Sequence, residues 1–194
     1  MKLALLMAAA LSAAPVTAQA PVIPSPMDVR AIRPIICGDG GGTAFWIDRD
    51  RIITAAHVSD NGACSSGGVP LEVVRVDRDL DFTELRGLPS DVWLAYSCAE
   101  PRTGDTFYAT GYPNGVLHTG AYVATDLGER EVSERVHENA FRVFIGRAWG
   151  GMSGSPNGDG DGVVHGILNA GAVPELPVPP TMLSRSLSET WICQ

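Results

Sequence analysis

From residue 42 onward, the chain alternates between short apolar runs and turn segments rich in Gly, Pro and Asp. β-Branched and aromatic side chains are frequent in the runs, which occupy residues 43–47, 51–55, 71–76, 107–109, 121–124, 141–145 and 163–168. Many short strands at regular spacing are typical of an antiparallel all-β sandwich or pair of barrels. The pattern therefore predicts an all-β fold, divided into two lobes near 101–105.

The first twenty residues follow a different pattern. Lys2 precedes an apolar run over residues 3–11, and Ala-Gln-Ala at 18–20 provides the small residues of a cleavage site. These features are typical of a secretory signal peptide, and the run is too short to span a membrane. We therefore expect residues 1–20 to be removed, leaving residues 21–194 as an exported domain, secreted or periplasmic, without membrane contact.

The C-terminal segment has helical periodicity. Leu183, Leu187 and Trp191 recur at i, i+4 and i+8, which predicts one amphipathic helix over about 181–193. Such a helix would pack its apolar face on the β-rich body. The expected fold class is thus all-β with a short C-terminal α-helix.

Charge and length limit the partners that can be expected. The 194 residues include 22 acidic and 14 basic side chains, a formal net charge of −8. An acidic surface does not favour binding to phosphate backbones or anionic lipids, so we expect no nucleic-acid partner. The length suits one compact unit or two small lobes, and we expect a monomer.

Four cysteines in an exported chain indicate two disulfides, for which three connectivities are possible. They are Cys37, Cys64, Cys98 and Cys193. We favour Cys37–Cys64, because that bridge would clamp the loop carrying His57. Cys98–Cys193 would then attach the C-terminus to the body.

No residue pattern predicts a metal or a cofactor. The cysteines and histidines lack the spacing of zinc ligands. Residues 157–162 match the opening of an EF-hand loop, but Leu168 stands at the twelfth position, where calcium needs a bidentate Glu. We favour a hairpin turn, since Asp and Gly suit turn geometry.

The segment Gly-Gly-Met-Ser-Gly-Ser-Pro at 150–156 is the strongest chemical signal, together with Thr-Ala-Ala-His ending at His57. A serine hydroxyl is a poor nucleophile near neutral pH unless a base takes its proton, so His57 is the candidate base for Ser153. The glycines beside Ser153 permit a sharp turn that directs amide N–H groups at a developing oxyanion.

Three carboxylates between these motifs are candidates to orient the imidazole. Asp77, Asp79 and Asp81 alternate along the chain, so on an extended strand all three would share one face. The order His, Asp, Ser is the order of the chymotrypsin-type triad.

Taken together, these segments resemble the secreted bacterial trypsin/chymotrypsin-like serine peptidases. The resemblance rests on residues 42–47, 52–57, 81–85, 104–113, 150–156, 164–167 and 191–192, in the family's order. It implies two antiparallel six-stranded β-barrels, at about 34–100 and about 104–180, with the active site in the cleft between them. It also implies a polypeptide substrate.

The resemblance assigns His57 as general base and then acid, and Ser153 as nucleophile. The amides of Gly151 and Ser153 would form the oxyanion hole. Asp81 fits the family's pattern of Asp, an apolar residue, a small residue, any residue and Leu. Asp79 fits it less well and stays the alternative, while Glu84 is expected to be a solvated strand residue.

By position in the family, two segments should line the primary specificity pocket. Their candidate residues are Arg147, Trp149, Asn169, Ala170 and Gly171. An acidic-residue preference would follow if Arg147 faced the pocket, but an exposed or salt-bridged arginine is favoured. Specificity therefore stays open.

Met152 stands before the nucleophile, where the digestive members carry an aspartate that pairs with a newly freed N-terminus. We therefore expect that zymogen-type cleavage does not organise this oxyanion hole. His165, His118 and His137 carry no partner signature, and we expect a structural role for the first and surface positions for the others.

The sequence thus predicts a secreted serine endopeptidase that works through an acyl-enzyme. Two alternatives stay open: ester hydrolysis by the same triad, and a catalytically silent family member that binds a partner in its cleft. An α/β-hydrolase is disfavoured, because the serine motif lacks the second Gly of Gly-x-Ser-x-Gly and His57 precedes Ser153.

Overall fold

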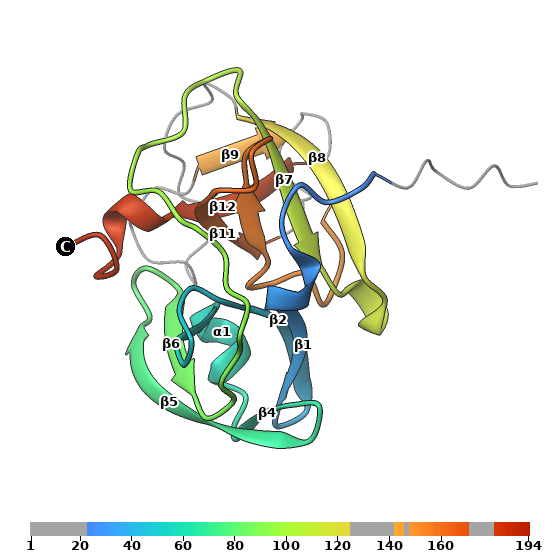
Figure 1. The fold of residues 1–194 in the computed structure, drawn as a ribbon, viewed down its shortest axis with the longest axis vertical. Helices are drawn as coiled ribbons and strands as arrows, with labels where there is room; N and C mark the ends of the chain where they lie inside the picture. Colours follow the sequence, from blue (N-terminus) through green and yellow to red (C-terminus); the bar gives the residue numbers. More distant parts are fainter. Residues whose placement is uncertain (1–22, 125–141, 146–147, 171–180) are drawn as a thin grey trace, which may run out of the picture.

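The computed structural model describes residues 23–124, 142–145, 148–170 and 181–194. These residues form an all-β structure, which confirms the predicted class. Figure 1 shows two groups of strands, the first half of the chain below and the second half above. The predicted signal peptide lies outside the described residues. Among the described residues, no helix has the length and hydropathy needed to cross a membrane.

The first sheet comes from the first half of the chain. Its strands are β1 (Ile32–Cys37), β2 (Gly40–Trp46), β3 (Ile52–Thr54), β4 (Cys64–Ser66), β5 (Val69–Asp77) and β6 (Phe82–Arg86). They pair antiparallel in the order β1-β2-β3-β6-β5-β4, and pairing of β1 with β4 closes the sheet. Phe45, Phe82 and Leu85 lie in its core because their apolar side chains leave water on folding.

The second sheet comes from the second half. Its strands are β7 (Thr106–Gly111), β8 (His118–Ala124), β9 (Arg142–Ile145), β10 (Pro156–Gly158), β11 (Val164–Ala170) and β12 (Thr181–Ser186). Their order is β10-β11-β12-β9-β8-β7, closed by pairing of β10 with β7. Phe107, Tyr122, Met152 and Leu168 belong to a second buried cluster.

The predicted C-terminal helix over 181–193 is wrong. Residues Thr181–Ser186 form β12, which pairs with both β11 and β9, and only a short 3₁₀ turn, η3 (Leu187–Glu189), follows. The backbone hydrogen bonds that β12 makes on both sides stabilise the strand, although the apolar residues of this segment recur at helical spacing. The apolar residues beyond the strand still face inward: Leu187 is buried, and Trp191 packs edge-on against Phe82, with ring centroids 5.1 Å apart.

Both predicted disulfides are confirmed. Cys37–Cys64 joins β1 to β4. Cys98 lies in the segment between the two sheets, and its disulfide with Cys193 attaches the C-terminal residues to that segment. The α-helix α1 (Ala56–Ser59) lies within the loop closed by the first bridge. That disulfide therefore restrains the segment that carries His57.

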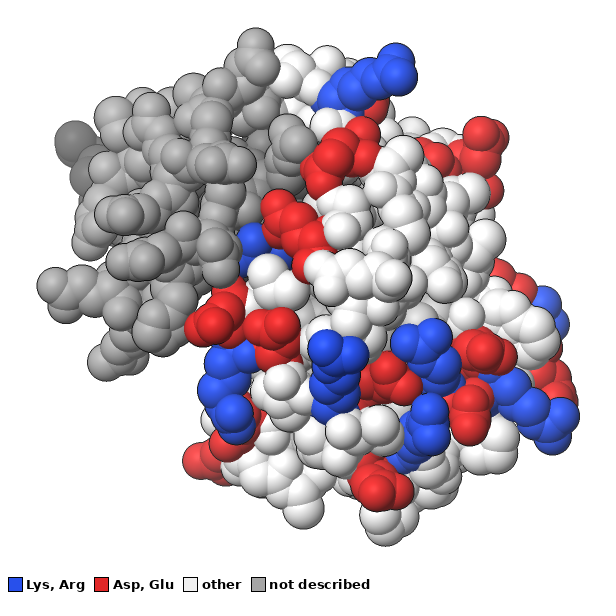
Figure 2. All heavy atoms as spheres, turned by 90° about the vertical axis from the view of Figure 1, so that its left-hand side faces the viewer, with Lys and Arg blue, Asp and Glu red and all other residues white. Residues whose placement is uncertain are grey.

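Glu84 is buried, contrary to the expectation of a solvated residue. Burial alone would raise the pKa of Glu84, but hydrogen bonds from Arg51 and Trp191 outweigh it and hold the pKa below its ordinary value. Arg75 lies over the Trp191 ring, 4.2 Å from its centroid. These contacts anchor the C-terminal residues to the first sheet. On the face shown in Figure 2, acidic and basic side chains are interleaved over this sheet.

Candidate active site

His57 and Asp81 are in direct contact. His57 lies in α1, the turn that follows β3, and Asp81 immediately precedes β6. The His57 Nδ1 atom lies 2.8 Å from Asp81 Oδ2, and the His57 backbone N–H donates to Asp81 Oδ1, also at 2.8 Å. An ionised carboxylate only accepts hydrogen bonds, so the contact places a proton on Nδ1. In a neutral ring, Nε2 is then the basic nitrogen.

The alternation of Asp77, Asp79 and Asp81 does not place them on one strand face. Strand β5 ends at Asp77, and the chain then turns, with Asp81 in the left-handed region at φ 49°. Asp77 Oδ1 accepts the Leu80 N–H within this turn. The backbone carbonyl of Asp79 faces Arg185 Nη2 at 3.4 Å. Among these three carboxylates, only that of Asp81 hydrogen-bonds to His57.

Asn169, one of the predicted pocket residues, has a buried side chain that contacts Asp81. Its Nδ2 atom donates to Asp81 Oδ2 at 2.9 Å and to the Asp81 carbonyl at 3.0 Å. Its Oδ1 atom accepts the Arg185 backbone N–H at 2.8 Å. A side-chain amide within the apolar run of β11 is buried and must therefore find hydrogen-bond partners inside the protein. The position of Asn169 in that run was the signal in the sequence for a buried hydrogen-bonding role.

Ser153 lies on the second half of the chain but is bonded to the first. Its carbonyl accepts the Thr43 N–H at 2.8 Å, and its Oγ donates to the Asn169 carbonyl at 3.5 Å. A Cβ at Gly42 would meet both the Ser153 carbonyl at 2.9 Å and the Val58 side chain at 2.8 Å. Gly42 therefore lies between the backbone of Ser153 and the side chain of the residue that follows His57.

No hydrogen bond joins Ser153 Oγ to His57 in the described part of the chain. The hydroxyl is turned toward the Asn169 carbonyl instead. Hydrogen bonds between catalytic groups are often long or misaligned before substrate binds. A rotation about the Ser153 χ1 angle changes the direction of the hydroxyl without moving the backbone.

Two glycines fix the backbone around Ser153. Gly151 has φ 93°, and a Cβ there would lie 2.6 Å from the Tyr112 carbonyl. Gly154 has φ 82°, and a Cβ there would lie 2.3 Å from the Thr43 carbonyl. Only glycine adopts this backbone at such close approach without strain. Among the described residues, the N–H groups of Gly151 and Ser153 donate to no protein acceptor.

The other predicted pocket residues are only partly described. Arg147 and Gly171 lie outside the described residues, and Ala170 ends β11. Trp149 is exposed, and its ring packs edge-on against His118, with centroids 4.6 Å apart. The side chain of Met152 is buried in the second cluster.

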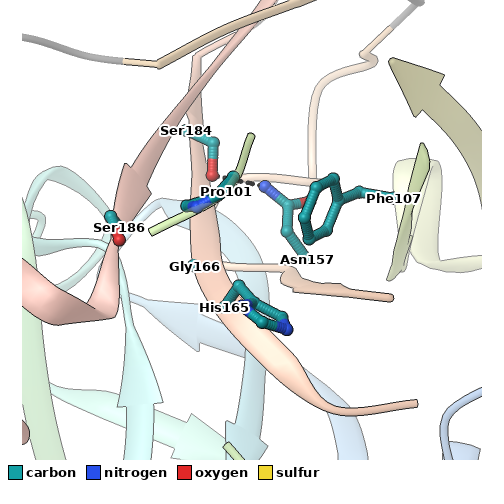
Figure 3. Close-up of a pocket in the computed structure, with 7 residues that line it drawn as sticks. All are labelled: Pro101, Phe107, Asn157, His165, Gly166, Ser184 and Ser186. Atoms are coloured by element: carbon teal, nitrogen blue, oxygen red, sulfur yellow. Dashed lines mark hydrogen bonds between the residues drawn. The ribbon is translucent and has the colours of Figure 1, made fainter. Parts of the chain in front are cut away.

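His165 has a structural role away from Ser153, where its side chain joins two segments of the chain. Its Nε2 atom lies 2.9 Å from Asp159 Oδ2, and its Nδ1 atom lies 3.2 Å from the Ala99 carbonyl. The side chain lines the hollow in Figure 3, where Asn157 donates to Ser184. This hollow has no room for a water molecule and touches none of the candidate catalytic residues. Among the described residues, no group of three metal-ligating side chains is present.

Comparison with known proteins places this arrangement in a family. Residues 42–167 match the model of the trypsin-like peptidase domain. No curated protein matches the chain.

Several solved structures share the fold. The active form of the Rv3671c protease from M. tuberculosis is 21% identical, with a TM-score of 0.67 over 92% of this chain and 91% of that one. The HtrA-type protease AlgW with a tripeptide is 16% identical, with a TM-score of 0.68 over 80% of this chain and 56% of that one. A serine endoprotease from Yersinia pestis is 16% identical, with a TM-score of 0.66 over 82% and 61%. The chain belongs to the trypsin-like peptidase family.

Proposed function

We propose that this protein is an exported serine endopeptidase that hydrolyses polypeptides through a Ser153–His57–Asp81 triad. The observation that carries the proposal is the paired contact of Asp81 with the ring and the backbone of His57, at 2.8 Å each. A carboxylate bound at both points fixes the ring orientation and favours the proton on Nδ1. The imidazole is then ready to act as a base through Nε2.

The reaction begins when Ser153 Oγ turns from the Asn169 carbonyl and attacks the substrate carbonyl carbon. His57 Nε2 takes the hydroxyl proton as the carbon–oxygen bond forms. The N–H groups of Gly151 and Ser153 hold the oxyanion, and losing one such donor typically costs ~10²- to 10³-fold in rate. His57 then gives its proton to the leaving amine as the carbon–nitrogen bond breaks. A water oxygen then attacks the acyl carbon as His57 Nε2 takes a proton from it, and His57 returns that proton to Ser153 Oγ as the ester bond breaks.

Export is supported by two observations. Residues 1–20 have the charge, apolar run and small residues of a signal peptide. The two disulfides form and persist in oxidising compartments outside the cytosol. The mature enzyme would therefore work in the periplasm or outside the cell.

Two alternative functions use the same cleft. Ester hydrolysis requires no change in the proposed machinery, because acyl transfer from an ester and from an amide share the tetrahedral intermediate. A catalytically silent member would bind a partner instead. The contact between His57 and Asp81 disfavours that alternative, since a binding protein has no need of an oriented imidazole.

A fluorophosphonate probe tests the proposal directly, because it reacts only with an activated serine. We expect covalent labelling of the mature protein that is lost in Ser153→Ala and in His57→Ala. Ser155→Ala is the matched control, since the Ser155 hydroxyl is buried and has no hydrogen-bond partner among the described residues. Labelling that survives Ser153→Ala, or no labelling of the folded native protein, would contradict the proposal.

Turnover of a protein substrate such as casein separates the peptidase from the esterase. We expect cleavage of internal peptide bonds, with Ser153→Ala reducing turnover by up to ~10⁶-fold. A protein that is labelled and hydrolyses esters, but leaves unfolded polypeptides intact, would be an esterase.

A further inference from the structure

A buried threonine of the first sheet binds the backbone on both sides of Met152. Thr43 lies in β2, and its side chain is fully buried. Its backbone N–H donates to the Ser153 carbonyl at 2.8 Å, and its Oγ1 atom donates to the Gly151 carbonyl, also at 2.8 Å. The N–H groups of Gly151 and Ser153 are the proposed oxyanion donors. One residue of β2 therefore holds the carbonyls of both donor residues.

The direction of the Thr43 hydroxyl is fixed by a third segment of the chain. The N–H of Tyr112, directly after β7, donates to Thr43 Oγ1 at 3.0 Å. A Cβ at Gly111 would lie 2.8 Å from the same oxygen, so the glycine that ends β7 permits this close approach. A hydroxyl has one proton to donate, and with the Tyr112 N–H bound to its oxygen that proton goes to the Gly151 carbonyl.

The other hydrogen bonds of the backbone at residues 151–155 are made to backbone groups. The Met152 N–H donates to the Trp149 carbonyl at 3.0 Å, and the Met152 carbonyl accepts the Ser155 N–H at 2.9 Å. Within the part of the chain that the structure describes, Thr43 is the residue that binds this backbone through a side chain. A substitution at Thr43 can therefore alter the segment without changing the segment's own sequence.

The start of this segment depends on outside contacts for its shape, because it consists of two glycines. Nothing lies within 4 Å of a Cβ at Gly150, and Gly151 has φ 93°. Glycine has more backbone conformations open to it than any other residue, so the peptide between these two can rotate unless hydrogen bonds restrain its neighbours. The Gly151 N–H belongs to that peptide, and the Thr43 hydroxyl restrains the carbonyl of the same residue.

We propose that Thr43 is a positioning residue for the oxyanion hole. Its hydroxyl holds the Gly151 carbonyl and thereby keeps the Gly151 N–H directed at the developing oxyanion. This inference rests on the proposed peptidase function. Thr43 acts through Gly151 and not on the substrate, so loss of the hydroxyl should slow the chemical step and leave substrate binding unchanged.

Fluorophosphonate labelling measures this step directly. Ser153 Oγ forms a bond to phosphorus, His57 takes the hydroxyl proton, fluoride leaves, and the phosphonyl oxygen takes the place of the oxyanion. Labelling rates at several probe concentrations give a maximal rate and a half-saturating concentration. In Thr43→Val, which keeps the branched shape but has no hydroxyl, we expect the maximal rate to fall ~10- to 100-fold and the half-saturating concentration to stay within about twofold. Thr43→Ser keeps the hydroxyl and should stay within about threefold of the native rate.

Thr190 supplies the matched control. It is also fully buried, its Oγ1 donates to the Leu187 carbonyl at 2.8 Å, and the same oxygen accepts the Ile192 N–H at 3.4 Å. Thr190→Val therefore removes the same two kinds of hydrogen bond, away from the serine segment. Both Val variants should unfold at lower urea concentration than the native protein, because each leaves a buried carbonyl without its donor. Only Thr43→Val should label slowly.

Three results would overturn the positioning role alone. The first is a native maximal rate in Thr43→Val, and the second is a rate in Thr43→Ser as low as that in Thr43→Val. If Thr43→Val does not fold, Thr43→Ala is measured in its place. Failure of both to fold, while Thr190→Val folds, is the third result and would assign Thr43 to folding. Absent labelling of the native protein, or labelling that survives Ser153→Ala, would instead overturn the proposed peptidase function and the role of Thr43 with it.

Discussion

The side-chain amide of Asn169 hydrogen-bonds to both the carboxylate and the main-chain carbonyl of Asp81, at 2.9 and 3.0 Å. Asn169 belongs to the second sheet, whereas Asp81 immediately precedes the last strand of the first. The same residue accepts the Ser153 hydroxyl through its carbonyl. One asparagine thus links two of the three proposed triad residues across the boundary between the sheets.

Replacing Asn169 by Ala should slow catalysis more than it weakens binding. Without the amide, the Asp81 carboxylate is held less firmly, and we expect kcat to fall ~10- to 100-fold with little change in KM. Asn169→Ser keeps a hydroxyl donor for Asp81 and should recover part of the loss. Steady-state kinetics on a peptide substrate measures both effects. Equal changes in kcat for the Ala and Ser variants would argue against a positioning role.

Asp81→Asn and Asp79→Asn should differ strongly. An amide in place of the Asp81 carboxylate would favour the wrong tautomer of His57, so we expect kcat to fall ~10³- to 10⁴-fold. Asp79 makes its contact with Arg185 through the backbone carbonyl, so its carboxylate can be replaced with less than about a threefold effect. Steady-state kinetics of the two variants on one peptide substrate measures the difference. Comparable losses in both would contradict the assignment of Asp81.

Gly151→Ala and Gly150→Ala form a matched pair next to the nucleophile. A methyl group at Gly151 would collide with the Tyr112 carbonyl at a positive φ, whereas nothing lies within 4 Å of a Cβ at Gly150. We expect the first substitution to displace the oxyanion donor and reduce kcat ~10²-fold or more, and the second to cost less than about threefold. Fluorophosphonate labelling rates and peptide kinetics measure the difference, and equal effects would exclude a special role for position 151.

Glu84→Gln should reduce stability at neutral pH by about 1–3 kcal/mol, because it removes a buried charge that Arg51 and Trp191 bind. The pKa of Glu84 is lower in the folded protein than in the unfolded chain. Over the acidic range the unfolded chain therefore binds more protons than the folded protein does. The stabilisation is therefore complete above the unfolded-state pKa and is lost as the pH falls through the folded-state value. Urea unfolding of both proteins across this acidic range should show their stabilities converging. A difference independent of pH would contradict this account.

Residues added ahead of Pro21 should leave activity within about threefold of the mature enzyme, because Met152 is buried and cannot pair with a charged terminus. Comparing labelling rates of the mature and extended proteins tests this. Strict dependence on a free N-terminus would contradict the expectation from Met152.

The sequence predicted the parts of the site that local motifs encode. Thr-Ala-Ala-His and the glycine-rich serine segment each need only their own neighbours to be recognised. The family's residue pattern favoured Asp81 over Asp79, whereas strand alternation alone could not separate them, because their separation depends on a turn in which Asp81 has a positive φ. The role of Asn169 depended on a contact 88 residues away along the chain. Such a partner is set by the tertiary fold and leaves no periodic signal.

The predicted C-terminal helix was wrong for the same reason, because contacts between distant segments leave no local signal in the sequence. The spacing of Leu187 and Trp191 suits a helix, yet β12 precedes them because β9 and β11 present backbone donors and acceptors on both sides. Edge partners of this kind come from distant segments. Local periodicity carries no information about them.

The placement of Arg185 makes the proposed catalytic centre depend on strand β12. The Arg185 backbone N–H donates to Asn169 Oδ1, and β12 follows the other described strands along the chain. A polypeptide truncated before β12 would keep Asp81 as a partner for the Asn169 side-chain nitrogen but would lose the donor that holds the side-chain oxygen. Such a fragment should therefore fail to assemble the proposed triad.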